Sequence, residues 1–468
     1  MELRPYQADL VSRVEDSTAQ SSLVVLTTGG GKTAIAEALT ARETARGGRV
    51  VFLADRQELI RQAHDRIGGT VIMGSLGRHN SPSAVTIASV ATLARRSDAP
   101  DATLVFADEA HLYAAESFRR VLGAYRDSGA RVVGLTATPA RLDGQGLGML
   151  FDEVIQGPPA EDLIRDGWLV PVDHRAPTGE WWDAVKLSGG DFDTTSLEAA
   201  SSAVLRDVAA RWLELGGAER PTLVFAVNKQ HARKLAAEFD AHLFLRGLPV
   251  SETVTDDTLT PVRRSVRDRI QSGDLRVVIT VGVLGTGFDA PAVSCNVMAR
   301  PTLSWALYLQ QGGRGLRTAQ GKRDLLLIDC AGNSLRHGLL TRPFSVSLDG
   351  VRRLHRRAVA GLTTCRKCFR IYEWTEPQCP GCGAARPRGA VRRVQEVDGQ
   401  LVELTGAQQW AERTTTDQQV RKLAAWIRDG AARGWKPGAP MARFKGTFHR
   451  WPSRQEIEEA KRLAGVAA

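Results

Sequence analysis

The segment Thr27-Thr28-Gly29-Gly30-Gly31-Lys32-Thr33 decides the fold of the front part of this 468-residue chain. It follows the apolar run Leu23-Val24-Val25-Leu26, which is typical of a buried strand, and it precedes a stretch of helical composition. Glycines in such a turn free backbone N–H groups to close around phosphate oxygens, and the following helix adds its positive N-terminal dipole. Lys32 then reaches the β- and γ-phosphates, and the Thr33 hydroxyl holds Mg²⁺. We therefore predict a phosphate-binding turn formed by Thr28, Gly29, Gly30, Gly31, Lys32 and Thr33.

A second motif, Asp108-Glu109-Ala110-His111, follows another buried-strand pattern at residues 103–107. Asp108 then stands where a magnesium-binding carboxylate is needed, and Glu109 stands where an attacking water must be oriented. Each motif alone has an ordinary explanation, a strand-to-helix turn for the first and a solvated helix start for the second. Together, in this order, they indicate hydrolysis of ATP.

Two regions of the chain alternate apolar, β-branched runs with helical stretches. The runs of the first region lie at 22–26, 49–53, 85–89, 103–107 and 131–135, and those of the second at 222–226, 275–281, 293–299 and 324–329. Apolar runs that alternate with helices imply a parallel sheet covered on both faces. We therefore predict an α/β protein with two tandem lobes, whose phosphate chemistry lies at the carboxyl ends of the strands.

The second region has two candidate ligand-binding segments of its own. Gln310, Arg314 and Arg317 are spaced i, i+4 and i+7, which places them on one helix face if the intervening glycines permit a helix. Guanidinium groups supplied across an interface suit the charge of a departing phosphoryl group, and a salt-bridged surface helix is the alternative. In the segment 285–291, glycines such as Gly287 let the backbone approach a ligand, and Asp289 could accept a hydrogen bond from a ribose hydroxyl.

The net charge of +10 is concentrated at the end of the chain. Residues 1–350 carry a balance of −2, whereas residues 351–468 carry +12. A basic appendage on a neutral body suggests a polyanionic partner, most simply nucleic acid, and a solvated surface is the alternative. The sequence shows neither a signal-peptide core nor a bilayer-spanning apolar run, so we predict a cytoplasmic protein.

Four of the six cysteines form two Cys-x-x-Cys pairs separated by ten residues: Cys365, Cys368, Cys379 and Cys382. Four thiolates close the tetrahedral shell of a structural Zn²⁺, and two disulfides or a redox pair are the alternatives. Cys295 and Cys330 are expected in the core. Contact with nucleic acid through Arg366, Lys367, Arg370 and Tyr372 and a role as folding staple only are equally compatible with the sequence.

These observations define five predicted segments. Lobe 1 spans residues 1–155, a connector 156–205, lobe 2 206–345, a zinc ribbon 360–390, and a basic, mostly helical region 400–468. The connector is acidic, and its tryptophans (Trp168, Trp181 and Trp182) are expected to pack against a lobe. In the last segment we expect most large aromatics to form a helical core, with stacking on unpaired bases as the alternative. These aromatics are Trp410, Trp426, Trp435, Phe444, Phe448 and Trp451.

The ordered set of motifs over residues 1–330 resembles the superfamily-2 helicases of the DEAD/DEAH type, which are built from two RecA-like lobes. The set comprises Arg4-Pro5-Tyr6-Gln7, Gly31-Lys32-Thr33, Asp108-Glu109-Ala110-His111, Thr136-Ala137-Thr138, Thr286-Gly287-Phe288-Asp289 and Gln310 to Arg317. Within that superfamily, residues 286–291, 313–317 and 329–333 look most like the RadD group of bacterial DNA-repair helicases and related phage helicases. RadD itself carries a longer tail than this chain.

The resemblance implies ATP, Mg²⁺ and nucleic acid as ligands, and it implies roles for matching residues. Arg4 and Gln7 would bind the nucleotide, with Gln7 recognising adenine. Gln310, Gly287 and Asp289 would belong to the same site, and Arg314 and Arg317 would be arginine fingers. Glu109 would act as the base for water, while Thr136 and Thr138 would couple ATP state to nucleic-acid grip.

The expected function is therefore an ATP-dependent DNA helicase or translocase in DNA repair or processing. Three alternatives stay open: an RNA-stimulated ATPase, the motor subunit of a restriction or defence system, and a zinc-containing nucleic-acid-binding protein with a silent ATP site.

Overall fold

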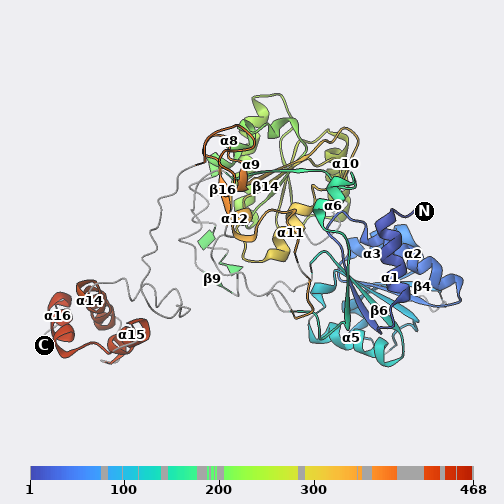
Figure 1. The fold of residues 1–468 in the computed structure, drawn as a ribbon, viewed down its shortest axis with the longest axis horizontal. Helices are drawn as coiled ribbons and strands as arrows, with labels where there is room; N and C mark the ends of the chain where they lie inside the picture. Colours follow the sequence, from blue (N-terminus) through green and yellow to red (C-terminus); the bar gives the residue numbers. More distant parts are fainter. Residues whose placement is uncertain are drawn as a thin grey trace. The chain divides into compact units, whose positions relative to one another are not determined.

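A computed structural model of the chain describes residues 2–74, 83–96, 98–113, 115–138, 146–176, 187–188, 191–193, 196–197, 205–282, 290–344, 346–349, 361–386, 416–432, 438–448 and 451–465. The chain divides into two compact units, Met1–Pro387 and Arg388–Ala468. The first unit contains two α/β lobes and a cysteine-containing hairpin, and the second contains three helices (Figure 1).

Lobe 1 is a seven-stranded parallel sheet with the strand order β3-β4-β2-β5-β6-β1-β7. Its strands are β1 Ser21–Val25, β2 Val50–Ala54, β3 Thr70–Ile72, β4 Val85–Ser89, β5 Leu104–Asp108, β6 Arg131–Thr136 and β7 Glu153–Gln156. Its helices are α1 Pro5–Asp16, α2 Lys32–Ala45, α3 Gln57–Ile67, α4 Val90–Leu93, η1 Ala110–Leu112 and α5 Glu116–Asp127. The five predicted strands are confirmed, and β3 and β7 were not predicted because they are short and half polar.

The sheet of lobe 1 is covered on both faces, as its apolar runs require. Alternate residues of β1 pack into different cores, Val24 with α1, α2 and α3 on one face and Leu23 with α4 and α5 on the other. Because both faces are buried, no alternation of polar residues is needed along the strand. The carboxyl ends of β1, β5 and β6 therefore carry the three lobe 1 motifs along one edge of the sheet.

Lobe 2 is a six-stranded parallel sheet with the order β12-β13-β11-β14-β15-β8. Its strands are β8 Val172–Arg175, β11 Thr222–Phe225, β12 Glu252–Val254, β13 Val277–Thr280, β14 Cys295–Met298 and β15 Leu325–Asp329. Its helices are α8 Leu205–Glu214, η3 Gly217–Glu219, α9 Lys229–Phe244, α10 Thr260–Ser272, α11 Trp305–Gly313 and α12 Asn333–His337. The four predicted strands are confirmed.

The predicted connector, residues 156–205, needs correction. Strand β8 lies inside it and pairs with β15, so the chain enters lobe 2 at residue 172. The crossing from lobe 1 to lobe 2 is residues 157–171, which include helix α6 Ala160–Arg165, and a small hairpin of β9 Leu187–Ser188 and β10 Asp191–Phe192 follows later. Trp168 packs against lobe 1, with the Arg4 guanidinium 4.8 Å from its ring centre, while Trp181 and Trp182 lie outside the described residues.

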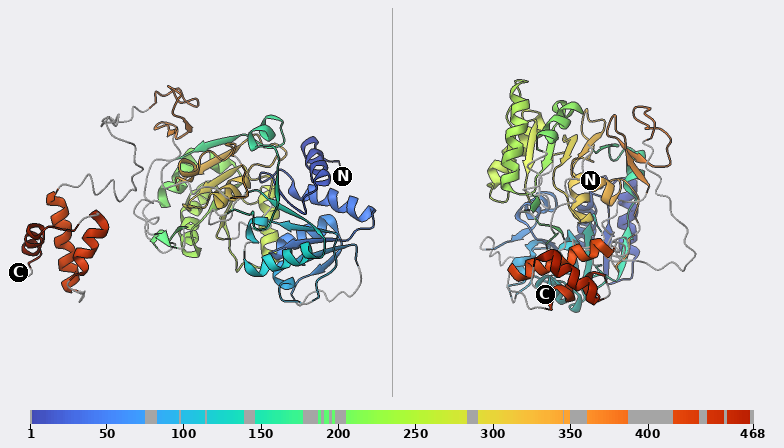
Figure 2. Two further views of the ribbon diagram at one scale, coloured as in Figure 1. Left: turned by 60° about the horizontal axis from the view of Figure 1, so that its bottom comes forward. Right: turned by 90° about the vertical axis from the view of Figure 1, so that its left-hand side faces the viewer.

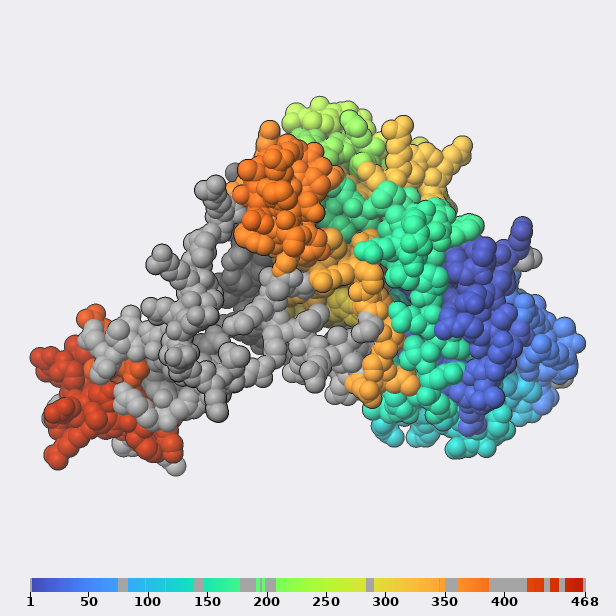
Figure 3. Space-filling model, in the orientation of Figure 1, coloured from blue at the N-terminus to red at the C-terminus, as the bar shows by residue number. Residues whose placement is uncertain are grey.

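The chain leaves lobe 2 near residue 344, close to the predicted end of lobe 2 at 345, but its return to lobe 1 was not predicted. Phe344, Val346 and Leu348 pack against the core that contains Phe151, and the Gly148 N–H donates to the Leu348 carbonyl over 3.0 Å. We call residues 340–349 the return segment; the yellow to orange chain follows this course beside lobe 1 in Figure 3. Among the described residues, two crossings therefore join the lobes.

The start of the return segment is fixed by a buried histidine. The Leu340 N–H donates to His174 Nε2 over 3.0 Å, and burial lowers the pKa of His174 to about 4. His337 in α12 is a second buried histidine; its ring bonds the Thr302 carbonyl, and burial lowers its pKa to about 4. Both rings are therefore neutral in the folded lobe at neutral pH.

We expect these histidines to make lobe 2 acid-sensitive. Their folded pKa lies below the unfolded value, so the unfolded chain binds more protons, and stability is lost as the pH falls from 6.5 toward 4. At pH 5 each should cost about 2 kcal/mol. Thermal unfolding of the wild type, His174→Gln and the exposed control His64→Gln between pH 7.5 and 5 checks this. A pH slope unchanged in His174→Gln would refute it.

The cysteine hairpin and the C-terminal unit complete the fold (Figure 2). The hairpin pairs β16 Leu362–Thr364 with β17 Ile371–Glu373 in antiparallel register. The C-terminal unit contains α14 Thr416–Ala432, α15 Ala439–Phe448 and α16 Arg454–Ala464, with Trp426 and Phe444 in its core. The core prediction is confirmed for these two and is wrong for Trp451, which is 56% exposed. Trp410, Trp435 and the Phe448 side chain lie outside the described residues.

Within the described parts of the chain, no helix combines the length and apolar character needed to cross a membrane.

Candidate nucleotide and zinc sites

The glycine-rich turn between β1 and α2 adopts a conformation that few other residues allow. Gly29 and Gly31 have φ angles of 88° and 89°, in the left-handed region, and Gly31 caps α2, which begins at Lys32. L-residues rarely adopt this region without strain, so two of the three glycines are required by the backbone itself. The turn thus presents the N-terminus of α2 and its dipole toward the edge of the sheet.

Residues of α1 hold this turn from outside. The Gln7 amide and the Tyr6 hydroxyl both donate to the Gly30 carbonyl, over 3.0 and 2.7 Å, and the Arg4 N–H donates to Gln7 Oε1 over 3.0 Å. Gln7 is 5% exposed, so it is fixed as one wall of the site. The contact of Tyr6 with the turn was not predicted, because nothing in the spacing of a tyrosine indicates it.

A cavity of about 600 Å³ opens between the lobes beside the turn. Eleven of the predicted site residues line it: Arg4, Gln7, Thr28, Gly29, Gly31, Lys32, Thr33, Asp108, Glu109, Arg314 and Arg317. Gly30 is not among the residues that line the cavity. A Cβ added at Gly30 would lie 2.7 Å from the Leu26 side chain. Gly287 and Asp289 lie outside the described residues. The structure thus brings together residues that are more than three hundred positions apart.

Two further arginines line the cavity and were not predicted. Arg66 comes from α3 of lobe 1, and Arg267 comes from α10 of lobe 2. Both lie on polar helices where arginine is ordinary, so the sequence carries no signal for them.

The acidic pair at the end of β5 is half-buried and incompletely compensated. Burial and the charge of Glu109 raise the pKa of Asp108 to about 7, against the opposing effect of Lys32. Among the described residues, the atom Glu109 Oε2 is buried and accepts no hydrogen bond, and His111 Nδ1 lies 3.6 Å from it. A buried carboxylate oxygen without a partner suits an ordered water, and the uncompensated negative charge suits a divalent cation. The donor set therefore fits Mg²⁺ at Asp108 and Thr33.

A chain of hydrogen bonds joins the lobes through His111. The Gln310 amide lies 2.9 Å from His111 Nε2, and His111 Nδ1 lies 3.2 Å from Thr136 Oγ1. Burial lowers the pKa of His111, so the ring is neutral. The Thr136 hydroxyl donates to the Thr138 carbonyl over 2.7 Å, which leaves Nδ1 as the proton-bearing nitrogen and Nε2 as acceptor for Gln310. Gln310 thus acts on the acidic motif through His111 and does not line the cavity.

The two predicted arginine fingers reach the cavity, although not from one helix face. Helix α11 ends at Gly313, Arg314 is its C-cap, and Arg317 lies in an extended bridge with Leu169. The expected i, i+4, i+7 alignment is therefore wrong, because the helix ends at Gly313 and Arg317 lies beyond it. Burial lowers the pKa of both arginines, that of Arg317 to about 10. Repulsion from Arg66 adds to the shift of Arg317, whereas for Arg314 the charge of Glu109 opposes the shift and Arg56 adds to it. Cations that lose solvation in this way favour binding of an anion.

Close contacts fix this end of α11 against the phosphate-binding turn. A Cβ at Gly313 would lie 2.4 Å from Thr28 Cβ, and a Cβ at Gly29 would lie 3.2 Å from Arg317 Cγ. The buried Asn296 side chain on β14 donates to the carbonyls of Gln311 and Gly312, over 3.2 and 3.0 Å. Asn296 thereby holds the last turn of α11 next to Arg314. Its place in an apolar strand did not predict this contact.

Family comparisons assign the two lobes separately. The model for the type III restriction enzyme, res subunit, matches residues 1–141, and the model for the helicase conserved C-terminal domain matches residues 207–319. These ranges carry the two walls of the cavity. The chain is a superfamily-2 helicase, a class of ATP-hydrolysing enzyme. The comparisons do not single out the RadD group.

Two curated relatives match much of this helicase. It is 26% identical over 365 residues to a 51.5 kDa protein of a Lactococcus phage (isolate 7-9), with 76% of each chain covered. It is 30% identical over 376 residues to irc3 of Schizosaccharomyces pombe, a protein named as a mitochondrial ATP-dependent helicase, with 75% of this chain and 60% of irc3 covered.

Two solved structures share its fold. One is a fragment of an HsdR subunit of a type I restriction enzyme from Vibrio vulnificus YJ016, with TM-score 0.56, 23% identity and coverage of 72% of this chain and 65% of that one. The other is the type ISP restriction-modification enzyme LlaBIII bound to DNA, with TM-score 0.52, 13% identity and coverage of 70% of this chain and 28% of that one. At these identities the likeness concerns the fold alone.

The four cysteines of the hairpin gather as a metal site would require. Their sulfurs all lie within 4.8 Å of one another, with Cys365 and Cys382 at 3.6 Å and Cys368 and Cys379 at 3.5 Å. Tetrahedral zinc bonds imply sulfurs about 3.8 Å apart, whereas a disulfide needs about 2 Å. Burial would raise the pKa of Cys365, but N–H groups of Cys368 and Lys367 outweigh burial and lower it to about 7. The donor set fits Zn²⁺, and the four cysteines are free thiols in this structure.

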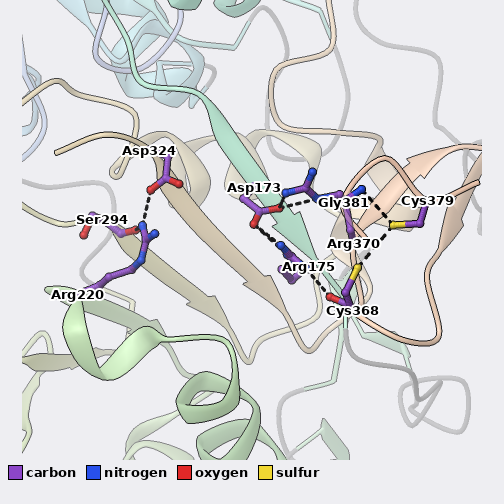
Figure 4. Close-up of polar contacts among 9 residues, drawn as sticks. All are labelled: Asp173, Arg175, Arg220, Ser294, Asp324, Cys368, Arg370, Cys379 and Gly381. Carbon is purple, nitrogen blue, oxygen red and sulfur yellow. Dashed lines mark hydrogen bonds and ion pairs between the residues drawn. The ribbon is translucent and has the colours of Figure 1, made fainter. Parts of the chain in front are cut away.

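The hairpin docks on the edge of the lobe 2 sheet (Figure 4). Asp173 on β8 pairs with Arg175 and with Arg370 of the hairpin, and the Arg175 guanidinium donates to the Cys368 carbonyl over 2.6 Å. Of the residues predicted to contact nucleic acid, Arg370 is thus engaged by Asp173 and Tyr372 is buried, whereas Arg366 and Lys367 are exposed. The hairpin extends lobe 2 and covers its edge strand.

We expect the wild type to carry one zinc and Cys382→Ser to lose it, because three thiolates do not close a structural shell. The hairpin should then become sensitive to protease while lobes 1 and 2 stay folded. Metal analysis with limited proteolysis checks both points, and Cys330→Ala, outside the cluster, is the control. Full zinc content in Cys382→Ser would contradict the assignment.

Proposed function

We propose that this helicase is a DNA-stimulated ATPase that moves along DNA, with the cavity between the lobes as its ATP site. The observation that carries the proposal is the meeting of Lys32, Asp108 and Glu109 with Arg314 and Arg317 in one cavity. Positive groups from two lobes and a half-buried acidic pair match the needs of phosphoryl transfer. DNA is proposed as the track because residues 286–291, 313–317 and 329–333 resemble the RadD group of DNA-repair helicases.

In ATP hydrolysis, the position of each residue in the cavity gives it a separate role. The amides of the turn and Lys32 hold the phosphates, and Thr33 and Asp108 hold Mg²⁺, which neutralises phosphate charge when bound. Glu109 orients water through its partnerless Oε2. Arg314 and Arg317 stabilise the charge that develops on the departing phosphoryl group.

Coupling to movement follows from the contacts between lobes. Gln310 from lobe 2 bonds His111, and His111 bonds Thr136 at the end of β6. We propose that loss of the γ-phosphate weakens the contacts of Arg314 and Arg317 and shifts the hydrogen bonds from Gln310 through His111 to Thr136. Opening of the lobes then changes the grip on the strand. We assign this grip to residues 54–56 and 89–92 of lobe 1, which resemble the backbone-gripping motifs of superfamily-2 helicases.

A second candidate, a motor subunit of a restriction or defence assembly, is favoured by one observation. The model that matches lobe 1 is that of a type III restriction enzyme subunit. The two candidates share the ATP site and differ in partners. A role in DNA repair stays a prediction from the RadD resemblance.

We expect Glu109→Gln to lower ATP turnover by about 10² to 10⁴-fold, because the amide cannot accept a proton from water. Steady-state ATPase rates without polynucleotide and with matched single-stranded DNA, duplex DNA and RNA provide the measurement. The control is Glu116→Gln, an exposed carboxylate on α5. Unchanged turnover in Glu109→Gln would refute the site, absence of stimulation by DNA would refute the proposed coupling, and stronger stimulation by RNA would favour the RNA alternative.

A further inference from the structure

The C-terminal unit distributes its charge unevenly. Helices α14 and α15 together hold five basic and two acidic residues, whereas α16 holds three of each. On α16 the charges also neutralise one another, since Arg454 pairs with Glu458 and Arg462 pairs with Glu459. The positive potential of the unit therefore comes from α14 and α15.

Three of these cations lie on aromatic rings. Lys422 of α14 and Arg443 of α15 both lie over Trp426, at 6.0 and 5.5 Å from its ring centre. Lys445 lies over Trp451, at 4.8 Å. Phe444, between the two α15 cations in sequence, is fully buried, so Arg443 and Lys445 emerge on opposite flanks of the helix.

The two tryptophans differ in exposure, and the difference assigns them different roles. Trp426 is 8% exposed and belongs to the core of the unit, whereas Trp451 is 56% exposed. An exposed indole is not needed to fill that core, which Leu423, Phe444 and Ala460 complete with Trp426. Lys445 contacts the Trp451 ring, and more than half of the side chain stays open to a ligand.

We propose that α14, α15 and Trp451 form a surface that binds single-stranded DNA. The strand crosses α15, with an unpaired base stacked on Trp451 and a phosphate paired with Lys445 on one flank, and with phosphates paired with Arg443 and Lys422 on the other. We call this set the α14–α15 surface. The proposal rests on the proposed function for its choice of DNA. An aromatic face beside cations suits a single strand, because every unpaired base offers a π-face and every nucleotide adds a negative charge. A duplex would engage the cations alone, since its bases are already stacked.

The test uses the full-length protein and two probes of equal length, oligo(dT) and a blunt duplex, with binding followed by fluorescence anisotropy from 50 to 300 mM NaCl. Trp451→Ala is expected to weaken oligo(dT) binding about tenfold and to leave duplex binding unchanged. Lys422→Gln/Lys445→Gln is expected to reduce the slope of log Kd against log salt by about 1.4, or 0.7 per cation on single strands. Arg454→Gln, whose side chain is 94% exposed on α16, is the matched control and should behave as the wild type.

Several outcomes overturn the proposal. If Trp451→Ala and Lys422→Gln/Lys445→Gln both bind oligo(dT) with wild-type affinity, the α14–α15 surface does not bind DNA. Equal weakening on duplex and oligo(dT) by Trp451→Ala would remove the stacking role. Circular dichroism and thermal unfolding separate these results from misfolding, and Trp451→Phe should retain most of the affinity because it keeps an aromatic face.

ATPase assays distinguish failure of this proposal from failure of the proposed function. If both proposals are right, Trp451→Ala keeps the wild-type turnover at saturating DNA and needs more DNA for half-maximal stimulation. A DNA-stimulated wild type whose Trp451→Ala variant has an unchanged DNA requirement would overturn the α14–α15 surface alone. A wild type that binds oligo(dT) through Trp451 but shows no stimulation would overturn the proposed function alone.

Discussion

Replacing Arg314 with alanine should lower the turnover of ATP by about 10³-fold, since arginines that reach across an interface contribute 10³ to 10⁵ in this chemistry. The guanidinium is buried in the cavity with Lys32 and Glu109. Its charge matters most when negative charge develops on the departing phosphoryl group, so ATP affinity should change little. Single-turnover hydrolysis and equilibrium binding of a fluorescent ATP analogue separate the two quantities.

The matched control for Arg314→Ala is Arg323→Ala, an exposed arginine of the same lobe. It should retain wild-type turnover. Arg314→Lys should recover only part of the rate, because an ammonium lacks the fork of guanidinium donors. If Arg314→Ala weakens ATP binding and turnover by the same factor, the residue binds the ground state and is not a finger.

Replacing Gly313 with alanine should reduce turnover by about 10²-fold, the order of loss expected from a displacement near 1 Å. The added Cβ would lie 2.4 Å from Thr28 Cβ, so the lobes must separate or α11 must shift. Gly313 is the last residue of α11 and has no left-handed φ angle, so its backbone conformation accepts alanine. Folding should therefore survive while catalysis fails. The measurement is ATP turnover together with thermal unfolding.

Gly123→Ala isolates the contact from the helix effect, because a Cβ at this position of α5 meets nothing within 4 Å. It should turn over ATP as the wild type does. Normal activity in Gly313→Ala would mean that the lobes need not approach as closely as the structure shows.

The sequence predicted the parts of the site that are local. Lys32 and Asp108 directly follow apolar runs, and the carboxyl edge of a parallel sheet is where such residues must meet. Runs such as 50–54 are buried on both faces, so hydrophobicity alone marks them. Strand β8, Val172-Asp173-His174-Arg175, was not predicted because three of its four residues are polar. Asp173 and Arg175 bind the cysteine hairpin, and His174 binds the return segment.

What the sequence did not predict depends on contacts between distant segments. The helix carrying Gln310 ends at Gly313, because Asn296 of another strand bonds its last carbonyls. No periodicity within residues 304–317 reveals that partner. Likewise Trp426 and Trp451 have similar basic neighbours in the sequence, and only packing decides that one is core and the other exposed.

The account stands on a nucleotide held by both lobes at once, and hydrogen–deuterium exchange tests it most directly. With Mg²⁺, ADP and aluminium fluoride bound to the wild type, amides of residues 27–33 and of residues 312–317 should both gain protection. Protection of residues 27–33 alone, with 312–317 exchanging as in the free protein, would contradict it.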